Sequence, residues 1–287
     1  MRKRITLAAV ILVTCIFAGY AGYGTPASAA DVPGYGQIPI ASSAALQKHI
    51  TESYYIKENA ARYIEYIKKY PSLPPDTAIA YVNVNVDKGP YIQITEIIQP
   101  ASILAMCNKN HMFPASYAPD DLIKVGGTSQ SLRAEAAAAY EAMAAAMKED
   151  GLRIIPYSGY RSYWSQATLY RTYALRDGAA RADTYSARAG HSEHQTGLAI
   201  DVLHKWWGGS LTSARFENTK EYEWLMEHAH EYGFILRYPK EFSHITGYTY
   251  EPWHWRYIGV EDATRMKDEG IETFEEYFGK YLITSLS

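Results

Sequence analysis

The stretch Ser192-Glu-His-Gln-Thr-Gly-Leu-Ala-Ile-Asp201 decides how this 287-residue chain is interpreted. It runs into Leu198-Ala-Ile-Asp-Val-Leu203, an apolar strand pattern interrupted by one carboxylate. Burying a carboxylate there is costly unless a cation or several hydrogen-bond donors satisfy it. His194 lies just upstream in a loop that contains glycine, so its imidazole can reach the same point. The stretch therefore predicts a buried site around Asp201 and His194.

A second stretch, Glu251-Pro-Trp-His254, adds another histidine and another carboxylate. His194, Asp201 and His254 then form a three-ligand set of the kind that binds zinc and leaves a fourth position to water. Spacing alone does not separate this set from histidines that simply pack. Glu251 is the natural candidate for a general base. Positions 251 and 254 of a regular strand face opposite sides, so we expect the backbone to bend or bulge near Pro252.

The third stretch, Ser158-Gly-Tyr-Arg-Ser162, predicts a tight turn from a strand into a helix. Arg161 in such a turn could make a two-pronged contact with a substrate carboxylate or a developing oxyanion. Gln166, one helical turn later, could add polar contacts. The alternative for Arg161 is an ordinary surface ion pair.

Composition excludes several classes of protein. The chain is 47% apolar and 21% charged with a net charge of −3, which argues against disorder and against an electrostatic nucleic-acid binder. Its length suits one large domain or two modest ones. Of the two cysteines, Cys15 lies near the N-terminus, and Cys107 sits in an apolar run and is expected to be a buried small hydrophobe.

The first thirty residues are typical of a secretory signal peptide. A basic start at residues 2–4 precedes an apolar run and a small-residue end, Ala27-Ser-Ala-Ala30. The alternative is a retained anchor over residues 5–23, which would be the protein's only contact with a membrane. Residues 31–44 are rich in Gly, Pro, Ser and Ala and are expected to be a linker. The sequence thus predicts an exported protein, secreted or in the cell envelope.

Two parts follow the linker. Residues 45–98 are interpreted as a small α/β lead-in, with a helix over 45–70 and a strand over 78–86. Residues 99–287 form the main domain. Its expected helices begin at the capping residues Ser131, Asn218 and Thr273 and near Trp164, and its expected strands cover 153–157, 198–203, 234–237 and 253–258. These elements alternate without a regular βαβ rhythm. We therefore expect an α+β fold in which helices flank a small, mostly antiparallel central sheet.

The three stretches, taken in order and ending in Glu251-Pro-Trp-His-Trp-Arg-Tyr257, closely resemble the VanY-type D-alanyl-D-alanine carboxypeptidases, which are zinc enzymes that trim peptidoglycan stem peptides. The resemblance covers roughly residues 100 to 260. It implies a zinc metallopeptidase core in which His194, Asp201 and His254 bind one zinc ion and Glu251 is the catalytic base. Arg161 would stabilise the polarised carbonyl or hold the substrate's terminal carboxylate.

The resemblance also implies residues that line the substrate pocket. Ser192 and Gln166 would belong to it, and Tyr250 and Trp253 flank the ligands and would form its walls, unless they simply pack in the core. The implied partner is a peptidoglycan stem peptide ending in D-alanine, of D,D- or L,D-type, and we expect a monomer. One departure is Ala189-Gly190, where the family often has Pro-Gly.

Two other functions remain open from the sequence. One is a zinc-dependent endopeptidase that cuts within the stem peptide. The other is a non-catalytic, zinc-stabilised wall-binding protein. Glu251, an acid that a purely structural zinc site would not need, favours an enzyme.

Overall fold

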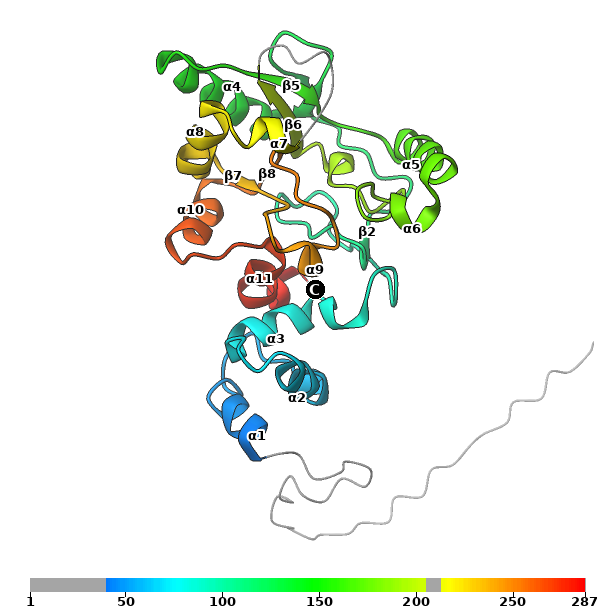
Figure 1. Ribbon diagram of the computed structural model, residues 1–287, viewed down its shortest axis with the longest axis vertical. Coiled ribbons are helices and arrows are strands. Elements are labelled where there is room, and N and C mark those ends of the chain that lie inside the picture. The colour runs from blue at the N-terminus through cyan, green and yellow to red at the C-terminus, as the bar shows by residue number, and fades with distance from the viewer. Residues whose placement is uncertain (1–39, 205–212, 287) are drawn as a thin grey trace, which may run out of the picture. The chain divides into compact units, whose positions relative to one another are not determined.

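Four strands form the central sheet of the computed structural model (Figure 1). They lie in the order β5 (Ile154–Ser158), β6 (Ala199–His204), β8 (His254–Tyr257) and β7 (Phe234–Leu236), and each is antiparallel to its neighbour. The connections between these strands carry helices rather than a repeating parallel crossover. The prediction of an α+β fold with an antiparallel central sheet is therefore confirmed.

The strand register places three polar residues in one row across the sheet. Ser158 on β5 lies opposite Asp201 on β6, and Asp201 lies opposite His254 on β8. The pairing of β5 shifts between Pro156 and Ser158, an irregularity that re-aims the end of the strand. Groups that are far apart in the chain thereby meet at one point of the sheet.

The structure describes residues 40–204 and 213–286, and in this part no helix is long and apolar enough to cross a membrane. The predicted signal peptide or anchor, and most of the predicted linker, lie outside the described residues. From Ile40 onward the chain forms one compact unit.

The remaining helices and strands are α1 (Ile40–Gln47), η1 (Lys57–Asn59), α2 (Ala60–Lys69), α3 (Pro75–Asn83), η2 (Val86–Lys88), β1 (Thr95–Glu96), β2 (His111–Met112), β3 (Leu122–Lys124), β4 (Ser131–Arg133), α4 (Ala134–Glu149), α5 (Tyr163–Asp177), α6 (Ala179–Ala182), η3 (Glu193–Thr196), α7 (Ser213–Phe216), α8 (Lys220–His228), η4 (Ala229–Tyr232), α9 (Ser243–Thr246), α10 (Val260–Asp268), α11 (Phe274–Tyr277), η5 (Phe278–Leu282) and α12 (Ile283–Leu286).

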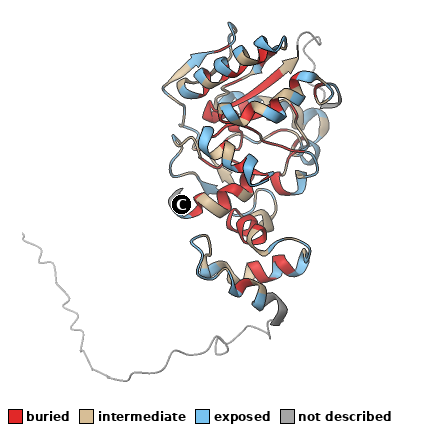
Figure 2. Cartoon of the chain, turned by 90° about the vertical axis from the view of Figure 1, so that its left-hand side faces the viewer, coloured by how far each residue is buried: buried red, intermediate tan, exposed pale blue. Residues whose placement is uncertain are grey.

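The main apolar core lies between the central sheet and α4. Tyr140, Met143 and Met147 of α4 pack into one cluster with Ile200 and Val202 of β6. Figure 2 shows the inner strands of the central sheet as mostly buried, whereas α4 and α8 carry both buried and exposed residues. Cys107 is fully buried, as expected for a small hydrophobe. The strands that form this core also carry Ser158, Asp201 and His254, the three polar residues aligned across the sheet.

The predicted strand over 78–86 is wrong, because these residues belong largely to α3. Pro75 occupies the first helical turn, where its missing N–H costs nothing. Every residue from Thr77 to Asn83 is buried, so the helix lacks a polar face and its sequence has no helical periodicity. The amide of Asn83, which looked like an outward strand position, donates to the carbonyls of Tyr54 and Gly279.

Several predicted boundaries also change. The single helix expected over 45–70 is interrupted by turns and η1 before α2 begins. Ser131 lies in β4 and caps nothing, since α4 begins only at Ala134. Thr219, rather than Asn218, caps α8 by accepting from the backbone N–H of Tyr222. Thr273 does cap α11, as predicted. Whether residues 45–98 are a separate functional part stays a prediction.

Candidate active site

His194, Asp201 and His254 converge on one buried point. Their potential ligand atoms all lie within 4.8 Å of one another, and each residue is at most 5% exposed. Nε2 of His194 is 3.4 Å from Oδ2 of Asp201, and Nδ1 of His254 is 3.0 Å from Oδ1. Although burial opposes ionisation, the two imidazoles hold the pKa of Asp201 well below its usual range. The carboxylate is therefore ionised and lies between two imidazole nitrogens.

Backbone geometry orients the first histidine. Nδ1 of His194 lies 2.8 Å from the carbonyl oxygen of Gly159, so this nitrogen donates and leaves Nε2 with its lone pair toward Asp201. Residue 159 must be glycine, because a Cβ there would lie 2.4 Å from the carbonyl oxygen of Ser131. The turn after β5 thus both carries Arg161 and orients a candidate histidine ligand.

Glu251 reaches the same site through a turn. Residues 252 and 253 are in a turn that precedes β8, and the backbone N–H of His254 donates to the carbonyl of Glu251. Oε2 of Glu251 consequently lies 3.9 Å from Nδ1 of His254. The predicted bend near Pro252 is confirmed. Burial raises the pKa of Glu251 to about 8, which suits a group that takes and returns a proton near neutral pH.

This donor set fits a catalytic metal ion. Two imidazoles and one carboxylate, buried together, are the ligands that zinc accepts in sites with an open fourth position. Within the described ranges, this is the one cluster of three His, Cys, Asp or Glu side chains close enough to share an ion. A cation held there would also lower the pKa of the neighbouring Glu251. The arrangement could therefore hold a metal ion with an acid–base group beside it.

Arg161 faces the same cavity without a carboxylate partner among the described residues. Its guanidinium donates to Oε1 of Gln166 at 2.6 Å and to Oγ of Ser158 at 2.7 Å. Gln166 is 1% exposed and is itself fixed, because its amide donates to the carbonyl of Ala187. These neutral partners hold the guanidinium in place and leave its charge available for an anion. The alternative of a surface ion pair is therefore not what the structure shows.

The cavity around this site has a volume of about 940 Å³. It is lined by the three candidate ligands together with Glu251, Arg161, Gln166, Ser192 and Trp253. Tyr250 does not belong to this lining, contrary to the sequence interpretation. Its hydroxyl instead donates to the hydroxyl of Tyr222 on α8.

Three charged residues near the site were missed by the sequence analysis. Glu193, Arg237 and Arg256 form a fully buried ion-pair cluster behind His254. Arg237 and Arg256 each interrupt an apolar strand pattern, which is the same signal that singled out Asp201. That signal, applied to positive residues, would have found both arginines.

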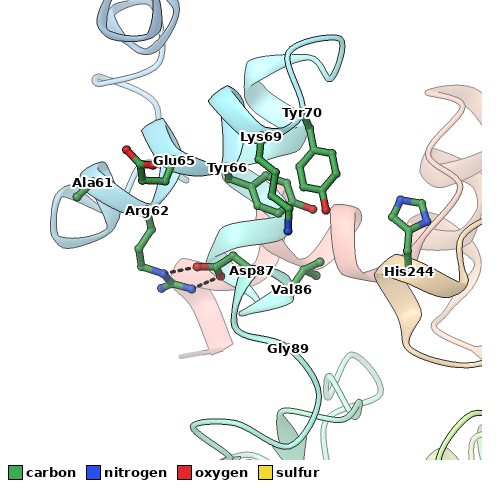
Figure 3. A pocket seen from close by; sticks show the side chains of 10 residues that line it. All are labelled: Ala61, Arg62, Glu65, Tyr66, Lys69, Tyr70, Val86, Asp87, Gly89 and His244. Atoms are coloured by element: carbon green, nitrogen blue, oxygen red, sulfur yellow. Dashed lines mark hydrogen bonds and ion pairs between the residues drawn. The ribbon is translucent and has the colours of Figure 1, made fainter. Parts of the chain in front are cut away.

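A second cavity, of about 540 Å³, lies beside α2 and η2 (Figure 3). Tyr66 and Tyr70 stand next to each other with ring centroids 4.7 Å apart, and the Arg62–Asp87 ion pair lies at one side. His244 is the one histidine in its lining. Its two carboxylates, Glu65 and Asp87, are each paired with a basic side chain. This cavity has no ligand set or poised acid–base pair and is not the candidate active site.

Comparison with known proteins gives the family. Residues 129–260, which contain every residue of the site, match the family model VanY: D-alanyl-D-alanine carboxypeptidase. YodJ of Bacillus subtilis (strain 168) is 40% identical over 196 residues, which is 64% of this chain and 70% of that protein. The chain belongs to the VanY D-alanyl-D-alanine carboxypeptidase family. The predicted family resemblance is confirmed.

Solved structures of VanY-family relatives share the fold. The LdcB LD-carboxypeptidase, whose structure reveals the molecular basis of peptidoglycan recognition, aligns with a TM-score of 0.61 and 38% identity over 65% of this chain and 90% of that one. The D,D-pentapeptidase VanY of a VanB-type vancomycin-resistance cassette, solved as a variant in complex with Zn(II), aligns with a TM-score of 0.52 and 30% identity over 61% and 98%. VanY-family relatives therefore include both L,D- and D,D-enzymes.

Proposed function

We propose that this VanY-family protein is a zinc-dependent carboxypeptidase that removes the C-terminal D-alanine from peptidoglycan stem peptides. One observation carries the proposal: a mostly buried acid, Glu251, stands beside the His194–Asp201–His254 set without being needed as a ligand. A structural metal site would have no use for it. Zinc is the ion proposed because the donor set suits it and because a VanY relative was solved with Zn(II).

The chain's own residues account for the steps of hydrolysis. A zinc ion, when bound, supplies Lewis acidity that activates water and polarises the scissile carbonyl. Glu251 accepts the proton of the attacking water as the C–O bond forms, and returns it to the amine as the C–N bond breaks. Arg161 binds the terminal carboxylate of the peptide or the developing oxyanion. Free D-alanine then leaves the cavity.

Gln166, Ser192 and Trp253 are proposed to shape the substrate pocket. Gln166 holds the guanidinium of Arg161 in a fixed position, so it acts on substrate through that residue. Ser192 and Trp253 line the same cavity as the proposed metal ligands. We further propose that the protein acts as a monomer outside the cytoplasmic membrane, after export directed by residues 1–30, because the stem peptides of the wall are found there.

Mass spectrometry of defined stem peptides tests the proposal. Purified protein should shorten a pentapeptide ending in D-Ala-D-Ala, a tetrapeptide ending in D-alanine, or both, by one residue, and the choice assigns D,D- or L,D-specificity. A chelator should abolish the reaction and added Zn²⁺ should restore it. Cleavage inside the stem peptide would make the protein an endopeptidase. Zinc binding without any cleavage would favour the wall-binding alternative.

Arg161→Lys should weaken substrate binding while leaving the zinc content unchanged. Lysine keeps the charge but cannot hold both Gln166 and Ser158 while presenting a fork to a carboxylate. Loss of one charge-assisted hydrogen bond corresponds to an increase in KM of about 10- to 100-fold. Steady-state kinetics measures KM and kcat separately, and Arg153→Lys at an exposed position is the matched control. An unchanged kcat/KM would remove Arg161 from substrate recognition.

A further inference from the structure

Glu193 precedes the ligand His194 in the chain, yet its carboxylate lies behind the other histidine ligand. Oε2 of Glu193 is 3.5 Å from Nε2 of His254, on the opposite side of the ring from the nitrogen that faces Asp201. Both atoms are buried, and neither has a hydrogen-bond partner within residues 40–204 and 213–286, so each is the other's one charged or polar neighbour at that distance. Two buried polar atoms that lack any other partner thus face each other.

The other oxygen of Glu193 is held rigidly. Oε1 accepts from Nε of Arg237 at 2.8 Å and from Nη1 of Arg256 at 3.0 Å. Arg237 also makes a two-pronged contact with Glu275, and Arg256 donates to the carbonyls of Ile103 and Ala105. None of these four charged side chains is exposed to solvent.

The charges of this cluster are balanced. Two arginines face two glutamates, so the group is neutral as a whole. Burying four charges is expensive, and apolar residues would fill the same space at lower cost. The cluster leaves one acceptor, Oε2 of Glu193, directed at the metal-ligand histidine. That geometry is what a carboxylate needs to orient an imidazole from behind.

We propose that Glu193 is a positioning residue for the metal site: it accepts the Nε2–H of His254 and so fixes the tautomer that presents the lone pair of Nδ1 beside Asp201. Arg237 and Arg256 keep the carboxylate in place. The two histidine ligands are then oriented in complementary ways, His194 through a backbone carbonyl at Nδ1 and His254 through a carboxylate at Nε2. This inference rests on the proposed function of the three-residue set as a metal site.

Two isosteric variants of the same cluster separate positioning from simple stability. Glu193→Gln removes the charge that faces His254. Glu275→Gln removes an equally buried charge that is hydrogen-bonded to Arg237 and not to a candidate metal ligand. The zinc dissociation constant is measured by competition with a chelating indicator, and thermal unfolding of each apo-protein is recorded beside it. We expect Glu193→Gln to weaken zinc binding about 10- to 100-fold, and Glu275→Gln to change it less than about threefold.

Both variants should lower the unfolding temperature of the apo-protein. Equal zinc affinity in Glu193→Gln and in the unaltered protein would overturn the inference, and so would equal losses in both variants. Failure of the unaltered protein to bind zinc would instead overturn the proposed metal site itself.

A measurement on the unaltered protein covers the case in which Glu193→Gln does not fold. Nitrogen-15 NMR of the histidine rings in the zinc-loaded full chain should show His254 protonated at Nε2 and His194 protonated at Nδ1. A His254 ring without a proton at Nε2 would contradict the assigned role of Glu193, because that nitrogen would then have no proton to donate.

Discussion

Glu251→Gln is expected to abolish the release of D-alanine while the zinc content stays at that of the unaltered protein. Glutamine has the same size but cannot take a proton from water or return one to the amine. Loss of general acid–base catalysis corresponds to a fall in kcat of about 10²- to 10⁴-fold. Glu251 is not one of the three converging ligands, so the metal should remain bound.

Two measurements on the same preparation check this result. A coupled assay records free D-alanine, and elemental analysis records zinc per chain. Glu149→Gln, at an exposed position at the end of α4, is the matched control and should behave like the unaltered protein. Turnover retained in Glu251→Gln would exclude Glu251 as the base, and lost zinc would place it among the ligands.

His254→Ala is expected to lose the metal and much of the protein's stability together. The ring occupies the centre of the site, 3% exposed, with Asp201 on one side and Glu193 on the other. Its removal leaves a hole between two buried carboxylates. Breaking a buried ionic contact of this kind costs about 3–5 kcal/mol. At about 2–4 °C per kcal/mol for a chain of this size, Tm should fall by at least about 6 °C.

Zinc per chain and calorimetric Tm test this second variant. His244→Ala, at an exposed position beside the cavity of Figure 3, is the control and should change neither quantity. Equal zinc content in His254→Ala and the unaltered protein would refute the ligand assignment. A normal Tm with lost zinc would show that the metal contributes little to folding.

The sequence located the site because each piece violates a local rule. Asp201 is a charge inside an apolar strand, and Pro252 predicts a bend between Glu251 and His254. Such signals are short-range and survive without knowledge of the fold. Tyr250 shows their limit, because it is adjacent to Glu251 in the chain and yet only Glu251 lines the cavity.

Errors arose where burial removes the pattern on which prediction depends. Residues Thr77 to Asn83 of α3 are all buried and show no helical periodicity, and the alternation of apolar and polar residues at 82–86 imitated a strand. The side-chain amide of Asn83 donates hydrogen bonds to the carbonyls of Tyr54 and Gly279, and Gly279 is almost two hundred positions away in the chain. A window of neighbouring residues does not contain such partners.

The amino-acid sequence by itself determined which chemical groups this protein has for catalysis, since the ligands, the acid and the arginine are carried by short local motifs. Only the tertiary structure decided how they meet. Antiparallel pairing aligns Ser158, Asp201 and His254 in one row. In the folded chain the carboxylate of Glu193 lies next to Nε2 of His254, on the side of that ring away from Asp201. The physical reason is that strand register and buried charge pairing depend on residues distant in sequence, whose joint geometry exists only once the sheet has formed.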